Sequence, residues 1–177
     1  MINCFSDDAI FEEEDIYNQA LPPPANTSSG LTMPGTKWCG PGNTAKNYDD
    51  LGSQKEVDKC CRDHDHCPDI IEHHKTLHGL YNGDLFPRLS CNCEQKFLNC
   101  LQTIDSTVST YLGRLYFGLR SNCFTEDYPI IQCSKYVTIT EIGDTTLPEQ
   151  RCVRYKLDKK KSKVWQYFDN PFFTRKT

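Results

Sequence analysis

The sequence predicts a mainly α, disulfide-rich fold, in which two long antiparallel helices are joined by disulfides and small peripheral strands lie toward the C-terminus. Three observations lead to this prediction. Eleven cysteines lie in a chain of 177 residues. Apolar residues recur at helical spacing in two separate segments. Beyond Cys133 the chain changes to short runs of β-branched and aromatic residues, which are typical of strands.

The cysteines compensate for a thin core, since 37% of the residues are hydrophobic and the mean hydropathy is −0.63. At this density disulfides are favoured over free thiols, which indicates an oxidising compartment. Zinc is a weaker alternative, because the close cysteine pairs are CC and CxC and not CxxC. No apolar run approaches the roughly 20 residues of a membrane span. The residues after Met1 are not a signal peptide either, so a secreted chain would be a processed or incomplete form.

Residues 1–31 are predicted to be a flexible N-terminal extension or propeptide, because an acidic cluster and a run of prolines offer no apolar face to bury. This segment holds the sequon at Asn26, where glycosylation is expected. The compact domain is expected over 32–168, with 169–177 as a C-terminal tail. The net charge of −4 argues against nucleic acid as a partner.

The helical spacing separates a short helix from a long one. After a loop at 38–52, the pattern predicts a short helix over 57–68. Glycines and a proline make 73–88 an irregular connection. One apolar stripe then predicts a single long helix over 93–118. Short strands are expected at 136–140, 151–155 and 164–168.

The cysteines of the two helices share one spacing. Cys60 and Cys67 are two helical turns apart, and so are Cys93 and Cys100. Antiparallel helices can be cross-linked twice only if Cys60 pairs with Cys100 and Cys67 with Cys93. The spacing suggests this pairing without proving it, because ten cysteines allow roughly nine hundred connectivities.

The segment between these cysteines carries groups suited to ester hydrolysis. His64 precedes the carboxylate Asp65, and the register above brings Glu94 close to His64. An imidazole with a pKa of about 6.5 can take a proton from water, and a carboxylate on its other nitrogen fixes the tautomer. Glycines in the loop at 38–42 let backbone carbonyls turn inward, and calcium binds carbonyl and carboxylate oxygens. The pattern therefore indicates a calcium-dependent ester hydrolase.

The same motifs resemble those of group III secreted phospholipase A2, the type in bee and scorpion venoms. The matching segments are PGTKWCGPGN at 34–43, CCRDHDHC at 60–67, LSCNCE at 89–94, YLGRLYFGL at 111–119 and KVWQYFD at 163–169. The resemblance implies a secreted, extracellular enzyme that hydrolyses the sn-2 ester of glycerophospholipids at a membrane surface. The products would be a fatty acid and a lysophospholipid, and the cofactor would be Ca²⁺.

The resemblance also implies roles for individual residues. His64 would be the catalytic histidine, Glu94 its acidic partner and Tyr116 the support of that acid. Calcium would bind the Asp65 carboxylate. The backbone carbonyls implied as further ligands are those of Trp38, Gly40 and Gly42. The implied disulfides are Cys39–Cys61, Cys60–Cys100, Cys67–Cys93, Cys91–Cys123 and Cys133–Cys152. Cys4 is left over, and it is expected to form an intermolecular disulfide, to be capped, or to be removed with the first thirty or so residues by processing.

One departure from the family pattern keeps other functions open. The family usually has Asp directly after the CxC motif, whereas this chain has Glu94. The alternative is therefore a catalytically weak, phospholipase-like toxin or receptor- or membrane-binding protein. A purely structural cysteine-rich module is a third interpretation, in which His64, Asp65 and Gly40 occur together by coincidence. Calcium-dependent release of fatty acid from vesicles separates an enzyme from the other two.

Overall fold

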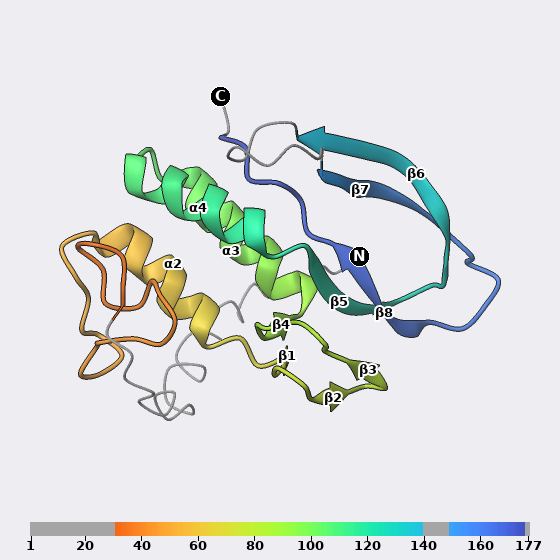
Figure 1. Ribbon diagram of the computed structural model, residues 1–177, viewed down its shortest axis with the longest axis horizontal. Helices are drawn as coiled ribbons and strands as arrows, with labels where there is room; N and C mark the ends of the chain where they lie inside the picture. The colour runs from red at the N-terminus through yellow and green to blue at the C-terminus, as the bar shows by residue number, and fades with distance from the viewer. Residues whose placement is uncertain (1–30, 140–148, 176–177) are drawn as a thin grey trace, which may run out of the picture.

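The computed structural model describes residues 31–139 and 149–175. The helices lie together in one half of the molecule, and a long β-ribbon extends in the other half (Figure 1). The helices are α2 (Lys55–Asp65), α3 (Cys91–Thr103) and α4 (Thr107–Leu119). Both α3 and α4 begin at a serine N-cap, Ser90 and Ser106, whose side chain accepts a hydrogen bond from the backbone N–H three residues on.

The strands pair two by two, and every pair in the described residues is antiparallel. The pairs are β1 (Ile70–Ile71) with β4 (Arg88–Leu89), β2 (Thr76–Leu77) with β3 (Leu80–Tyr81), β5 (Asn122–Asp127) with β8 (Val164–Asp169), and β6 (Ile130–Ile139) with β7 (Glu149–Leu157). The turn between β2 and β3 places His78 and Gly79 at φ of 53° and 76°, the left-handed conformation of a tight hairpin turn.

The prediction of a mainly α fold with two long antiparallel helices is wrong. The described strands hold about as many residues as the described helices, and none of those helices exceeds 13 residues. The single helix predicted over 93–118 is two helices, because α3 ends at Thr103 and α4 begins at Thr107, after the N-cap Ser106. The apolar stripe hides this break, since both helices turn their apolar side to the same core. Periodicity reports which face is buried and carries no information on backbone hydrogen bonds.

The disulfide-rich character of the fold is confirmed. The described residues form the disulfides Cys39–Cys61, Cys60–Cys100, Cys67–Cys93, Cys91–Cys123 and Cys133–Cys152. These pairs are the same as those that the family resemblance implies. Cys60–Cys100 joins α2 to α3, and Cys67–Cys93 joins the residues just after α2 to the first turn of α3. The two bonds lie on either side of His64 along the chain and hold these helices antiparallel. Cys4 and Asn26 lie outside the described residues.

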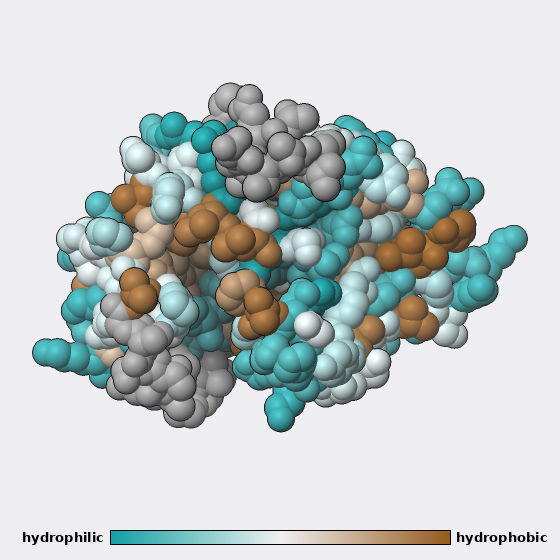
Figure 2. Space-filling model, viewed as in Figure 1, coloured by the Kyte–Doolittle hydropathy of each residue, from teal (hydrophilic) through white to brown (hydrophobic). Residues whose placement is uncertain are grey.

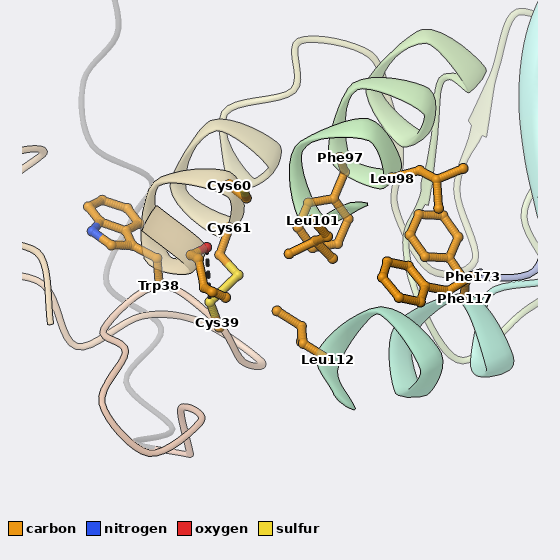
Figure 3. Close-up of a cluster of buried hydrophobic side chains, with 11 residues drawn as sticks. Trp38, Cys39, Cys60, Cys61, Phe97, Leu98, Leu101, Leu112, Phe117 and Phe173 are labelled. Atoms are coloured by element: carbon orange, nitrogen blue, oxygen red, sulfur yellow. Dashed lines mark hydrogen bonds between the residues drawn. A yellow bond between two sulfur atoms is a disulfide. The ribbon is translucent and has the colours of Figure 1, made fainter. Parts of the chain in front are cut away.

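Most of the hydrophobic core lies between the three helices, and Trp38 lies on the loop side of α2 (Figure 3). Its buried members are Trp38, Cys39, Val57, Cys60, Cys61, Phe97, Leu98, Leu101, Leu112, Phe117 and Phe173. Phe173 follows the last strand and presses on α4 at Gly113, where an added Cβ would lie 2.3 Å from the phenyl ring. The segment after β8 is therefore part of the core that supports the helices.

The face of the molecule shown in Figure 2 has no single continuous apolar patch. Apolar side chains form several separate groups between hydrophilic areas (Figure 2). No helix of the described residues is both long enough and apolar enough to cross a bilayer.

Candidate active site

Three polar side chains meet where α2, α3 and α4 converge. His64 comes from the last turn of α2, Glu94 from the first turn of α3 and Tyr116 from the last turn of α4. The Tyr116 hydroxyl donates to Glu94 Oε1 at 2.9 Å and lies 3.2 Å from His64 Nε2. Glu94 Oε2 lies 3.5 Å from the same nitrogen. The structure thus brings together the residues for which the sequence implies catalytic roles.

Aromatic rings hold the imidazole of His64 in one plane. Phe97 stacks on it, with ring centroids 4.2 Å apart and an interplanar angle of 26°. Tyr116 meets it edge-on, at 5.1 Å and 85°. The side chains of His64 and Glu94 are 9% and 3% exposed, so water has little access to their contact. The stacking of Phe97 was not assigned a role from the sequence, although Phe97 lies one turn from Glu94 on the same helix face.

The protonation of Tyr116 determines the direction of these hydrogen bonds. Burial, followed by the negative charge of Glu94, raises the pKa of Tyr116 well above its usual value. The hydroxyl therefore keeps its proton and donates a hydrogen bond to Glu94, which leaves the Tyr116 oxygen to accept a hydrogen bond from His64 Nε2–H. With the proton on Nε2, the lone pair of the neutral imidazole is on Nδ1.

The loop that the sequence predicts to hold calcium is attached to α2 by a buried carboxylate. Asp58 is fully buried and accepts hydrogen bonds from the backbone N–H groups of Trp38 at 2.8 Å and Gly52 at 2.7 Å. It also accepts from the backbone N–H of Lys37. The Cys39–Cys61 disulfide joins the same loop to the same helix. Sequence reasoning missed Asp58, and its place beside Val57 on the inner face of α2 was the available signal.

Two glycines of this loop occupy positions that other residues do not fit easily. A Cβ on Gly40 would lie 2.1 Å from the Leu31 carbonyl oxygen, so the close approach of the two backbone segments requires glycine. Gly42 has a φ of 84°, which is the left-handed region. These features fix the path of the backbone through the loop that the sequence predicts to hold calcium.

The Asp65 carboxyl is largely buried and lacks a protein partner among the described residues. Among residues 31–139 and 149–175 no hydrogen-bond donor or ion-pair partner contacts it. Burial, and then the charge of Asp58, raises the pKa of Asp65 to about 8. No group of three or more His, Cys, Asp or Glu side chains in that part of the chain could hold a metal. Asp65 with loop carbonyls, the donor set of a hard cation such as calcium, fits these observations.

A histidine held by a buried carboxylate and a tyrosine is an arrangement suited to a hydrolase that activates water. A sequence model of the phospholipase A2 family matches residues 32–127. A phospholipase A2 of Apis dorsata is 41% identical over 141 residues, which cover 78% of this chain and 97% of that relative. One of Bombus terrestris is 43% identical over the same length and shares. Phospholipase A2 phaiodactylipin of Anuroctonus phaiodactylus is 46% identical over 123 residues, 64% of this chain and 77% of that protein.

The chain therefore belongs to the phospholipase A2 family. It is an enzyme that hydrolyses the sn-2 ester of glycerophospholipids to a fatty acid and a lysophospholipid.

Proposed function

We propose that His64 is the general base of the hydrolysis and takes a proton from the attacking water at Nδ1. Glu94 and Tyr116 hold the opposite nitrogen, which orients the ring, and the Glu94 charge stabilises the imidazolium that forms. The observation that carries this proposal is the set of contacts among these three side chains, between 2.9 and 3.5 Å. Return of the proton to the leaving alkoxide completes the reaction at the same nitrogen.

The Asp65 carboxylate and the backbone carbonyls of Trp38, Gly40 and Gly42 would hold calcium in this proposal. The unpartnered carboxyl of Asp65 and the loop conformation support this assignment. Bound calcium supplies a Lewis acid for the substrate phosphate and the developing oxyanion. A backbone N–H near Gly40 would donate to that oxyanion. Asp58 holds the loop against α2, so the ligands on the two segments keep one mutual position.

The setting that we propose is extracellular, with a phospholipid membrane surface as the place of reaction. The five disulfides support an oxidising compartment. Glycosylation at Asn26 and an intermolecular disulfide through Cys4 belong to the same proposal. Mass analysis of secreted material under non-reducing conditions tests both, and an intact monomer with a free Cys4 thiol would contradict the disulfide.

Release of fatty acid from mixed phospholipid vesicles tests the mechanism. Hydrolysis should require calcium and stop with a chelator. His64→Gln should lower turnover by at least about a hundredfold, while calcium binding is largely kept. His73→Gln, a change of a histidine outside the site, is the matched control and should keep turnover. Near-normal turnover of His64→Gln, or hydrolysis that a chelator leaves untouched, would overturn the proposed mechanism.

A further inference from the structure

Positive charge is concentrated in one short segment of the chain. Residues 154–163 hold six lysines and arginines and one aspartate, a net charge of +5, whereas the whole chain carries −4, so the remaining residues together carry −9. The segment runs from β7 through the turn that leads to β8. This turn lies at the end of the molecule away from α2, the helix that carries His64 (Figure 1). The concentration of charge is therefore a feature separate from the active site.

The turn between β7 and β8 is held by hydrogen bonds of Asp158. The Asp158 N–H donates to the Pro129 carbonyl at 2.8 Å, which ties the turn to the start of the ribbon. The Asp158 side chain accepts from the Lys160 N–H at 3.2 Å, and its carbonyl accepts from the Lys161 N–H at 3.2 Å. Every lysine of the turn is exposed. The turn therefore presents its lysines to solvent on a backbone of defined shape.

The adjoining part of β7 presents further cations on one face. Tyr155 points toward β8, where its ring meets Phe168 edge-on at 4.9 Å and its hydroxyl accepts from the Asp169 N–H at 2.8 Å. Because side chains alternate along a strand, Arg154 and Lys156 project from the opposite face, and both are exposed. The ribbon thus continues the positive charge of the turn.

One cross-strand pair of the ribbon places like charges opposite each other. Lys135 of β6 is the register partner of Arg154 of β7. Like charges directly opposite each other in a sheet are destabilising. The exposed cations of the ribbon and the turn form one basic surface, made up of Lys135, Arg154, Lys156, Lys159, Lys160 and Lys163. In the part of the chain that the structure describes, no carboxylate forms an ion pair with any of them.

The acids nearest to the basic surface do not neutralise it. Asp158 forms its ion pair with Lys161, at 3.7 Å, which leaves the six other cations without it. Glu126 and Asp127 lie at the end of β5, and neither forms an ion pair among the described residues. Asp127 Oδ1 instead accepts from the backbone N–H of Tyr128. A group of cations without counter-charges attracts an anion that carries several charges.

We propose that the basic surface binds a sulfated polysaccharide, an extended polymer with many negative charges. Six cations spread over a ribbon and a turn suit a row of anionic groups better than one small anion. Binding to a lipid surface also buries apolar side chains, and residues 154–163 expose no large apolar side chain. Tyr136 and Val164 are exposed at the edges of the surface, so an anionic lipid surface is the alternative that the test must separate. The inference goes beyond the proposed hydrolysis, in which none of these cations takes part.

Binding of fluorescently labelled heparin, a sulfated polysaccharide, tests the inference by fluorescence anisotropy. The triple variant Lys156→Gln/Lys159→Gln/Lys160→Gln should bind heparin about tenfold or more weakly at low salt, because three contacts to the polyanion are lost. The slope of log affinity against log salt should become shallower by about two units, since three cations no longer release counterions from the polymer.

A matched control separates this surface from the overall charge. Lys55→Gln/Lys75→Gln/Lys96→Gln removes three exposed lysines from other parts of the molecule and changes the net charge by the same amount. Its heparin affinity should stay within about twofold of the unsubstituted protein, because exposed charges farther away than the screening length contribute little. Equal losses in the two triple variants would overturn the inference.

Lys135→Gln separates binding from a structural role. It removes one of two opposed like charges, so it should weaken heparin binding about twofold or more while the free energy of unfolding is kept or rises. A loss of stability with unchanged heparin affinity would overturn the inference. So would a triple variant at 156, 159 and 160 that binds phosphatidylglycerol vesicles more weakly and heparin as before, since the partner would then be lipid. His64→Gln should bind heparin normally, so a failure of the proposed mechanism gives a different result.

Discussion

At His64, the proposed general base, the length of the Glu94 side chain decides which contacts the acid makes. Glu94 reaches Tyr116 with one oxygen and lies near His64 with the other. The first turn of α3 is held by two disulfides, Cys67–Cys93 and Cys91–Cys123, directly ahead of Glu94. We therefore expect the backbone here to suit the longer acid, although the resemblance implies aspartate at this position.

Glu94→Asp should lower kcat by about tenfold or more, because the shorter side chain withdraws from Tyr116 and His64, and small misplacements are costly in catalysis. Initial rates of fatty-acid release at saturating vesicle concentration measure the change. Glu94→Gln is the companion variant, since it keeps the length and removes the charge. A higher rate for Glu94→Asp would mean that the longer side chain compromises His64, and an unchanged rate for Glu94→Gln would remove this side chain from catalysis.

Calcium binding should depend on pH through Asp65. Without calcium, burial raises the pKa of Asp65 to about 8, so the carboxyl is mostly protonated at neutral pH. Calcium must displace this proton, and its affinity should rise about tenfold per pH unit below the pKa and level off above it. Calorimetric titration between about pH 6 and pH 9 measures the slope. Asp65→Asn should bind calcium weakly and without this slope, whereas a pH-independent affinity in the unsubstituted protein would contradict the prediction.

At the scale of the elements, α4 depends on the chain end that packs against it. Phe173 is 7% exposed and fills the space above Gly113. Asn170 donates to the Arg120 carbonyl at 3.3 Å, and Arg151 donates to the carbonyls of Phe117 and Gly118. These hydrogen bonds satisfy backbone carbonyls in the last turn of α4, directly after Tyr116. The segment assigned from the sequence to a C-terminal tail thus contacts the helix that carries Tyr116.

Phe173→Ala should lower the free energy of unfolding by about 3 kcal/mol or more, because it removes a buried ring and leaves a cavity at Gly113. Denaturant unfolding with the disulfides intact measures the loss. Leu85→Ala is the control, since Leu85 is 80% exposed, and its effect should stay within about 0.5 kcal/mol. Equal stabilities of the two variants would show that the chain end does not support the core.

At the scale of the whole molecule, disulfides hold together small elements that bury little surface each. The described helices have 11 to 13 residues, and the strands pair only two by two. Each disulfide joins segments 19 to 40 residues apart, which restricts the unfolded chain and stabilises the fold. The start of the compact domain near Thr32 stays a prediction, and retained hydrolytic activity of a chain that begins there would test it.

The sequence alone determined the family and the chemistry of the site. Spacing is a local property, so the run around His64 and Asp65, the glycine loop and the paired cysteines could be recognised without a structure. The register of α2 against α3 followed from two cysteine pairs, and it placed Glu94 near His64. The sequence failed on the length of the helices, because one apolar stripe continues across the break at Ser106.

Only the tertiary structure decided which distant residues complete the site. Asp58 anchors the loop because its carboxylate accepts hydrogen bonds from buried backbone N–H groups of that loop. Phe97 stacks on His64 through a contact between α3 and α2. No local pattern marks such residues, because a phenylalanine in a helix looks the same in the sequence whether or not it will pack against a functional side chain. Their roles arise from packing and burial, which exist only once the elements have come together.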